Sequence, residues 1–376
     1  MKSLIFKRDA LYKLSASYVP EKLPRREEHQ AEIFNTIISF LEEKMPLKAI
    51  VLSGPSGTGK TVTVKKASEQ VLKYCEQRKI RLEYRHLNTR FASSDFTLSQ
   101  MIALSLLPNI PGRGYSSREL LYAVFDHLEK SGNSFLLVLD DFDDFLGKAR
   151  SRFFTDLLKI SEEYSDKVKL ILVLIGIQDI SRQVGDSWLT HFLWKIGKSF
   201  TPYGAEEITM ILKDRVKLSF NENTVDDSLI YMMGRMTERF GYGSARYALE
   251  LLLMSGLNAS YEGSPRVMVE HVREAQYRLE SLINPIDLKT LSSQDPEMTR
   301  LLQKLQVAFE SSEEPFLNFR VLEEYGVKAK EASTIERLKR LHMEGLLDYD
   351  QSRKEVALIM PLKLLQSALE ASRKRL

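Results

Sequence analysis

The sequence contains a complete glycine-rich pattern of the kind that binds phosphate groups. It matches G-x-x-x-x-G-K-[ST] at every specified position, with the residues Gly54, Pro55, Ser56, Gly57, Thr58, Gly59, Lys60 and Thr61. In such a loop, backbone N–H groups point at phosphate oxygens, the lysine reaches the β- and γ-phosphates, and the threonine hydroxyl ligates Mg²⁺. A chance glycine-rich turn is disfavoured, because residues 49–52 predict a strand before the loop and residues 61–77 a helix after it. We therefore predict that this loop, extended to Val62, binds ATP or ADP with Mg²⁺.

Two aspartates follow an apolar run further along the chain. Residues 135–139 predict a buried strand, so Asp140 would lie where that strand reaches the ligand-binding edge of a sheet. Asp140 is a candidate Mg²⁺ ligand, directly or through water, and Asp141 is a candidate base that orients the attacking water. Asp143 and Asp144 are better interpreted as the solvated start of a helix, because acidic residues stabilise a helix N-terminus.

These side chains need a sheet that brings strand ends together. Strand and helix patterns alternate through the first half of the chain, which predicts an α/β fold with a parallel sheet covered on both faces. The predicted strands are 49–52, 81–87, 135–139 and 168–175, and the predicted helices are 31–43, 61–77, 96–107, 117–129 and 153–164.

Strand patterns nearly stop after Pro202, which predicts a second, all-helical domain. Its helical segments are 205–219, 226–239, 243–257 and 267–281. The last section predicts helices followed by a hairpin, the element order of a winged helix-turn-helix, with helices at 297–310, 317–325 and 331–343 and strands at 346–349 and 355–359. The expected domains are thus 1–200, which includes an N-terminal arm, 201–284 and 285–376.

Composition limits the classes of function. The 376 residues are 43% apolar and 28% charged, with 54 basic and 51 acidic residues, so the net charge is only +3. Binding to nucleic acid must therefore depend on local patches. The single cysteine, Cys75, excludes an intrachain disulfide and a cysteine-rich zinc site, and it favours a reducing cytoplasm. No apolar run has the length of a membrane span, so we expect a cytoplasmic protein without a membrane partner.

The C-terminal section has candidate DNA contacts, although residues 291–376 contain 14 basic and 14 acidic residues. A recognition helix over 331–342 and the hairpin tip would contribute Lys330, Ser333, Thr334, Arg337, Arg340, Arg353 and Lys354. From these residues alone, DNA binding and protein binding by a winged helix are equally good interpretations.

Several segments together resemble the archaeal origin-recognition and cell-division-control replication initiators, which are AAA+ ATPases. The similar segments are 18–28, 200–203, 211–215, 243–250 and 271–276, in family order. The resemblance implies adenine contacts from Tyr18, Val19, Pro20 and Arg25. It also implies nucleotide contacts from Tyr203 and Arg215 of a helical lid, and a lid arginine, Arg246, that senses the γ-phosphate and assists catalysis. The alternative for Arg246 is a solvent-exposed position on a helix without a role in nucleotide binding.

The resemblance further implies duplex origin DNA as a partner, and the replicative helicase and paralogous initiators as further partners. Loop 108–115, with Arg113 at its centre, occupies the place of a family insertion that touches DNA. The alternative for this loop is a plain connection between two helices. A DNA-bound protein of this kind would be cytoplasmic and associated with the nucleoid.

The chain departs from the family pattern at three places. Asp141 replaces a longer glutamate, the polar sensor after strand 168–175 is either Gln178 or Asp179, and segment 188–195 lacks an arginine for a neighbour's nucleotide, with Arg182 displaced. A shorter acid and a missing arginine predict slow hydrolysis, hence a switch rather than a motor. Two alternatives remain open: a nucleotide-locked DNA-binding regulator, and a signalling ATPase whose winged helix binds protein.

Overall fold

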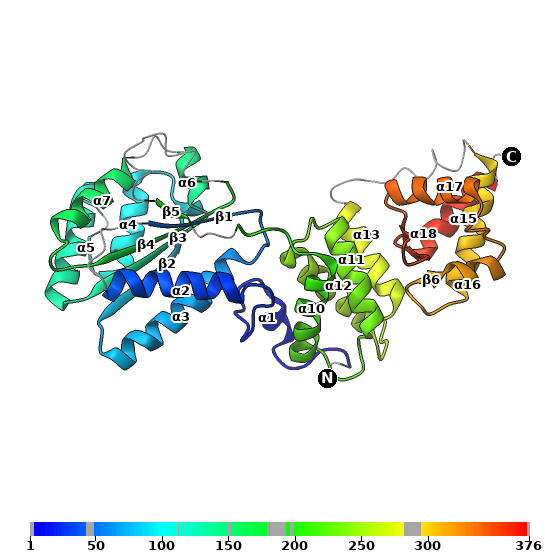
Figure 1. The fold of residues 1–376 in the computed structure, drawn as a ribbon, viewed down its shortest axis with the longest axis horizontal. Coiled ribbons are helices and arrows are strands. Elements are labelled where there is room, and N and C mark those ends of the chain that lie inside the picture. The colour runs from blue at the N-terminus through cyan, green and yellow to red at the C-terminus, as the bar shows by residue number, and fades with distance from the viewer. Residues whose placement is uncertain are drawn as a thin grey trace. The chain divides into compact units, whose positions relative to one another are not determined.

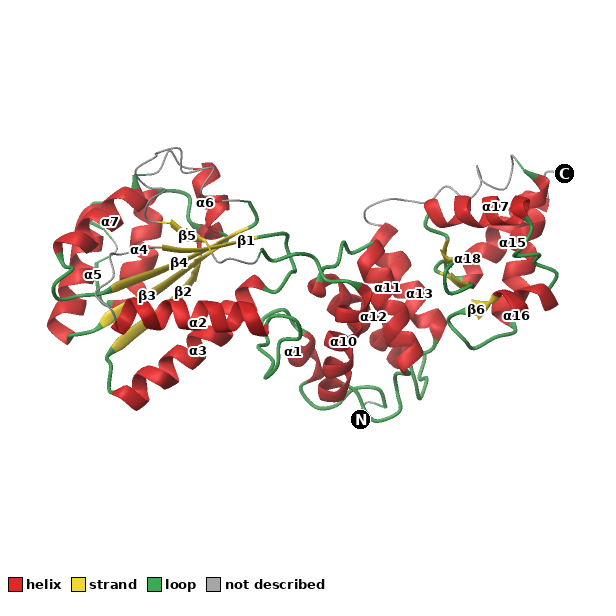
Figure 2. Ribbon diagram, viewed as in Figure 1, coloured by secondary structure: helices red, strands yellow, loops and turns green. Residues whose placement is uncertain are grey.

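The computed structural model describes residues 4–42, 49–111, 113–148, 152–178, 180, 193–195, 199–281 and 295–373. The chain divides into two compact units, one of residues Val19–Pro202 and one that joins Met1–Tyr18 to Tyr203–Leu376. Figure 1 follows the chain through these units, and Figure 2 separates their helices from their strands.

The Val19–Pro202 unit is built on a five-stranded parallel sheet in the order β2-β3-β4-β1-β5. The strands are β1 (Ala49–Ser53), β2 (Leu82–Asn88), β3 (Ser134–Asp140), β4 (Leu170–Gly176) and β5 (Leu193–Lys195). Strand β4 lies between β1 and β3. Because the strands are parallel, the carboxyl ends of β1 and β3 lie at the same edge of the sheet, one on each side of β4. The predicted α/β parallel-sheet fold is therefore confirmed.

Helices cover both faces of this sheet (Figure 2) because each strand presents alternate apolar residues to opposite sides. Helices α2 (Glu27–Glu42) and α3 (Lys60–Arg78) form one core with Ile50, Leu136 and Val138. The other core receives Val51 and Leu137 and is formed by α4 (Asp95–Leu106), α5 (Ser117–Ser131), α6 (Phe142–Lys148) and α7 (Phe153–Glu163). A short 3-10 turn, η1 (Thr89–Phe91), follows β2.

The second unit begins with a helical bundle. Its helices are α10 (Ala205–Ser219), α11 (Asp227–Arg239), α12 (Ala245–Tyr261) and α13 (Val269–Ser281). The N-terminal arm, with α1 (Ala10–Leu14), packs on this bundle: Phe6 pairs with Phe220 as an isolated β-bridge, and their ring centroids lie 4.9 Å apart. The sequence grouped the arm with the sheet domain, and that grouping is corrected for residues 1–18, because Ile5 and Leu14 are buried in the core of the helical bundle.

The C-terminal part of this unit has its own core and a small antiparallel sheet, β6-β8-β7. Along the chain it contains α15 (Pro296–Glu310), β6 (Leu317–Asn318), α16 (Phe319–Glu324), α17 (Ala332–Met343), β7 (Leu347–Asp350), β8 (Glu355–Leu358) and α18 (Leu362–Arg373). This is the element order expected for a winged helix, with an additional final helix that the sequence pattern did not predict. None of the helices in the described parts of the chain has both the length and the apolar character to cross a membrane.

Candidate functional site

The phosphate loop connects β1 to α3 and is held in a conformation that only glycine adopts easily. Gly54, Gly57 and Gly59 have φ angles of 150°, 77° and 89°. A Cβ atom on Gly54 would lie 2.4 Å from the carbonyl oxygen of Phe200. Gly59 is the N-cap of α3 and has no side chain to cap the first turn, so that turn presents backbone donors to an anion.

The side chain of Lys60 is buried against this loop. Its Nζ donates to the carbonyl oxygens of Gly54 and Pro55, at 2.6 and 2.9 Å. The Thr58 hydroxyl also donates to Pro55 O, at 2.8 Å. The loop is therefore folded around the ammonium group, which can exchange carbonyl acceptors for phosphate oxygens.

The phosphate loop is supported by an arginine that was not among the predicted site residues. Arg26 is buried, and its Nε donates to Thr58 O at 2.9 Å while Nη2 donates to Thr201 O at 2.8 Å. The predicted residue, Arg25, is exposed and has a left-handed φ of 63°. Helical spacing could have found Arg26, because it precedes the buried positions His29 and Ile33 of α2 by three and seven residues.

The carboxylate of Asp140 lies at the end of β3 and accepts several hydrogen bonds. Its Oδ2 is 3.1 Å from Nε2 of His86, its Oδ1 accepts from the N–H of Asp141 at 3.1 Å, and the Thr61 hydroxyl also hydrogen-bonds to it. Burial alone would raise the pKa of Asp140, but the contacts with His86, Thr61 and the Asp141 N–H outweigh burial and lower it. Asp140 is therefore an ionised carboxylate next to the phosphate loop.

This pair of oxygen donors fits Mg²⁺. The two predicted ligands, Thr61 and Asp140, contact each other, and carboxylate and hydroxyl oxygens are the ligands that Mg²⁺ prefers. No group of three or more His, Cys, Asp or Glu side chains suited to a metal occurs in the parts of the chain described.

Asp141 is held by the end of β2. Its Oδ2 accepts from Nδ2 of Asn88 at 2.8 Å, and its backbone has a left-handed φ of 54°. The Thr89 hydroxyl donates to the carbonyl oxygens of Asp140 and Asp141, at 2.9 and 3.0 Å. Asn88 and Thr89 were not predicted from the sequence, and their only signal is their position at the end of β2 and directly after it.

The interpretation of Asp143 as a solvated residue is wrong. It is buried, and its Oδ2 accepts from the N–H groups of Ile177 and Gln178, at 2.9 and 3.1 Å, so it fastens the end of β4 to α6. Asp144 is partly exposed in the first turn of α6, where it pairs with Arg90 at 3.5 Å. Of the two sensor candidates, Gln178 follows β4 with an exposed side chain. Asp179 lies outside the described residues, as do Arg182 and most of 188–195.

The residues that the family resemblance implies as nucleotide contacts of the lid lie on the helical unit. The guanidinium of Arg215 lies 4.8 Å from the ring centroid of Tyr18, and its Nη1 donates to Lys13 O at 2.8 Å. Burial lowers the pKa of Arg215. Tyr203 is buried, and its N–H donates to Gly243 O at 3.0 Å. Arg246 is exposed in the first turn of α12. The other two predicted adenine contacts, Val19 and Pro20, are the first residues of the sheet unit.

Three of the seven predicted DNA contacts of the C-terminal part, Lys330, Arg337 and Arg353, are paired with acidic groups. Lys330 lies 2.9 Å from Glu323, and Nε of Arg337 lies 2.9 Å from Oδ2 of Asp295, the N-cap residue of α15. The contact with Arg337 is the main reason that the pKa of Asp295 is lowered. Ser333, Thr334 and Arg340 lie on α17, with Ser333 exposed in its first turn. Arg113 is exposed between α4 and α5, and its contact with DNA stays a prediction.

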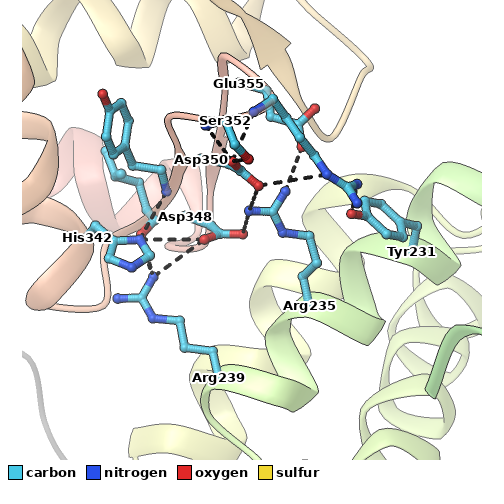
Figure 3. A network of polar contacts seen from close by, with 11 residues as sticks. Tyr231, Arg235, Arg239, His342, Asp348, Asp350, Ser352 and Glu355 are labelled. Atoms are coloured by element: carbon cyan, nitrogen blue, oxygen red, sulfur yellow. Dashed lines mark hydrogen bonds and ion pairs between the residues drawn. The ribbon is translucent and has the colours of Figure 1, made fainter. Parts of the chain in front are cut away.

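The hairpin β7–β8 packs on the helical bundle rather than standing free (Figure 3). Arg353, at the predicted wing tip, hydrogen-bonds to the Tyr231 hydroxyl, and its guanidinium lies 5.0 Å from the Tyr231 ring centroid. Lys354 is exposed, with a left-handed φ of 55°. The acidic face of the hairpin surrounds Arg235 of α11, with Asp348, Asp350 and Glu355 at 2.7, 3.3 and 2.6 Å.

The sheet order, the phosphate loop after β1, the aspartate after β3 and the helical bundle that follows define an AAA+ nucleotide-binding protein. Residues 46–184 match the AAA domain, and residues 209–277 match the Cdc6 AAA+ ATPase-type lid domain. The ORC1-type DNA replication protein of Desulfurococcus amylolyticus is 30% identical over 269 residues, which cover 71% of this chain and 67% of that protein. The chain therefore belongs to the family of ORC1-type DNA replication proteins.

Other relatives match a greater share of the chain. The ORC1-type DNA replication protein 2 of Sulfurisphaera tokodaii is 29% identical over 359 residues, which cover 91% of this chain and 85% of that protein. The crystal structure of Cdc6p from Pyrobaculum aerophilum has a TM-score of 0.78 at 23% identity and covers 99% of both chains. The Aeropyrum pernix ORC1 protein in complex with DNA has a TM-score of 0.65 at 21% identity and covers 99% of this chain and 98% of that one. These structures have the same fold.

Proposed function

We propose that this protein is a replication initiator that binds ATP or ADP with Mg²⁺, binds duplex origin DNA and hydrolyses ATP slowly as a switch. Membership of the ORC1-type family supports the first two parts, because relatives are named as DNA replication proteins and one structure of similar fold is a complex with DNA. The loop around Lys60 and the contact between Thr61 and Asp140 supply the groups that bind a magnesium nucleotide.

The observation that carries slow hydrolysis is the engagement of Asp141. A catalytic base must accept a proton from water, but one oxygen of this carboxylate already accepts a hydrogen bond from Asn88 at 2.8 Å. Aspartate is also one methylene shorter than glutamate, so its carboxylate reaches less far from the end of β3. Both features keep the base away from an attacking water, and a positioned base is worth about 10²–10⁴-fold in rate.

Single-turnover hydrolysis of radiolabelled ATP by the full chain tests this part. We expect slow turnover by the wild type and faster hydrolysis by Asn88→Ala, which releases the carboxylate, and by Asp141→Glu, which extends it. Asp141→Asn removes the base and is the matched control, so its rate should fall below that of the wild type. Rapid multiple turnover by the isolated wild-type protein would refute the switch.

Footprinting on origin DNA with ATP, with ADP and without nucleotide tests the DNA-binding part. In this proposal Arg113 contacts a phosphate, so Arg113→Ala should weaken binding and reduce the slope of log affinity against log salt by about one. Arg78, an exposed arginine on α3, provides a control whose replacement leaves the slope unchanged. An unchanged slope in Arg113→Ala would remove the α4–α5 loop from the interface. Recruitment of the replicative helicase is a further expectation, and a pull-down of the helicase on origin DNA tests it.

Two alternatives have specific support. The contact between Asn88 and Asp141 also suits a nucleotide-locked DNA-binding regulator, which would give origin footprints but no measurable turnover. The pairing of Lys330 with Glu323 and of Arg337 with Asp295 suits a C-terminal domain that binds protein. That alternative predicts no affinity for duplex DNA at physiological salt.

A further inference from the structure

We infer that His86 is a positioning residue that orients Asp140 and thereby sets the affinity of the nucleotide site for Mg²⁺. This inference rests on the proposed binding of a magnesium nucleotide by Thr61 and Asp140. It adds a residue of the neighbouring strand β2 to a site whose sequence motifs lie on β1, α3 and β3.

The geometry places His86 between a tyrosine and the carboxylate. Tyr84 and His86 are two residues apart on β2 and share one face of the strand, and the Tyr84 hydroxyl lies 3.2 Å from Nδ1 of His86. On the other side of the ring, Nε2 lies 3.1 Å from Oδ2 of Asp140. Strands β2 and β3 are in parallel register, with Asn88 opposite Asp140, so the backbone pairing fixes the distance between the ring and the carboxylate.

The hydrogen-bond roles follow from the chemistry of the three groups. An ionised carboxylate only accepts, so Nε2 of His86 carries the hydrogen in its contact with Asp140. In a neutral imidazole Nδ1 is then the acceptor, and the Tyr84 hydroxyl donates to it. Asp140 therefore sets the tautomer, the Tyr84 hydroxyl holds the ring in its orientation, and the ring in turn fixes one oxygen of Asp140.

The hydrogen bonds to Asp140 leave one acceptor position of its carboxylate for the metal. Oδ1 accepts from the N–H of Asp141 at 3.1 Å, and the Thr61 hydroxyl also donates to the carboxylate. A carboxylate has about four acceptor positions, so three donors leave one for the metal or a water bound to it. Without His86 the carboxylate could turn about its side-chain bond, and that one position would no longer be directed. Residues that orient metal ligands in this way are commonly worth about 10–100-fold in metal affinity.

The experiment measures binding rather than hydrolysis. The full-length protein is titrated with fluorescent ADP at a series of MgCl₂ concentrations and in EDTA, and the Mg²⁺ concentration for half-maximal tightening is compared. For His86→Leu we expect this concentration to rise by about 10–100-fold, with the ADP affinity in EDTA unchanged. His86→Gln, which keeps a donor on a side chain of similar reach, should remain close to the wild type, and Tyr84→Phe should give an intermediate increase.

The controls separate a positioning role from other roles. His127→Leu replaces a histidine on α5 of the same unit and should change nothing. Unchanged Mg²⁺ dependence in both His86→Leu and Tyr84→Phe would overturn the inference. An equal loss of ADP affinity in EDTA, or an equal fall in thermal stability for His86→Leu and His86→Gln, would also overturn it in favour of a structural role. If wild-type protein bound ADP without any dependence on Mg²⁺, or did not bind it, the proposed function itself would fail.

Discussion

Replacing Arg235 tests how the lid holds the C-terminal domain. Arg235 projects from α11 into the acidic face of the β7–β8 hairpin, as Figure 3 shows, and its side chain is only 13% exposed. Asp348 and Glu355 are 2.7 and 2.6 Å from its guanidinium, and Asp350 is 3.3 Å away. Arg235→Met keeps most of the apolar stem but removes the charge.

The expected loss of stability in Arg235→Met follows from the three carboxylates that are left without their cation. The three carboxylates are 14%, 21% and 22% exposed, so they are mostly removed from water. Removing one partner of a buried ion pair costs about 3–5 kcal/mol, because the other charge is left uncompensated. Arg239 still lies 3.8 Å from Asp348, and water can reach the partly exposed acids. Both effects reduce the expected loss of stability to the lower end of this range, about 3 kcal/mol.

Hydrogen exchange of the backbone amides in β7 and β8 measures this change directly. A loss of about 3 kcal/mol corresponds to roughly 100-fold faster exchange, since each 1.4 kcal/mol is about tenfold. Exchange of the amides in β1, β3 and β4 follows the other unit and should be the same in the variant as in the wild type.

A second arginine provides a matched control. Arg266 also links the lid to the C-terminal part, with Glu313 at 2.6 Å, but these side chains are 45% and 74% exposed. An exposed pair contributes about 0–1 kcal/mol, so Arg266→Met should leave exchange in the hairpin almost unchanged. Equal protection of the hairpin in Arg235→Met and Arg266→Met would refute the reasoning, because it would mean that the acids around Arg235 are effectively solvated.

Three further predictions concern His342 next to Arg239, Asp143 at the end of β4, and Gly54 in the phosphate loop. Burial, followed by the charge of Arg239, lowers the pKa of His342, so the unfolded chain binds more protons and hairpin protection should fall as pH drops below about 6.5. His342→Asn keeps an acceptor for Arg239 without titrating, and exchange measured against pH should lose this dependence. Asp143→Ala leaves the N–H groups after β4 without their acceptor and should lower the stability of the sheet unit by about 1–3 kcal/mol in urea unfolding, and Asp143→Asn by less. Gly54→Ala places a methyl group against the Phe200 carbonyl and should abolish binding of fluorescent ADP, whereas native circular dichroism would show that the protein still folds.

The local sequence determined the elements and the motifs that lie within them. The segment from Gly54 to Thr61 leads from a strand into the first turn of a helix, and Asp140 ends an apolar run, so both could be assigned from neighbouring residues. The alternation of strands and helices was likewise sufficient for the parallel sheet, since buried strands of this kind read as continuous apolar runs. The positions of the helices after Pro202 follow from their 3.6-residue periodicity in the same way.

Only the tertiary structure decided which distant side chains complete these motifs. His86 and Asn88 reach Asp140 and Asp141 because β2 and β3 are adjacent and in register, and that pairing joins residues 53 or 54 positions apart. Arg26 reaches Thr58 because α2 packs beside α3. Lys330 and Arg337 were selected from the sequence as DNA contacts, but their acidic partners, Glu323 and Asp295, come from or next to other helices. Hydrophobic periodicity specifies which face of an element is buried, whereas the partner of a polar side chain depends on which elements pack together.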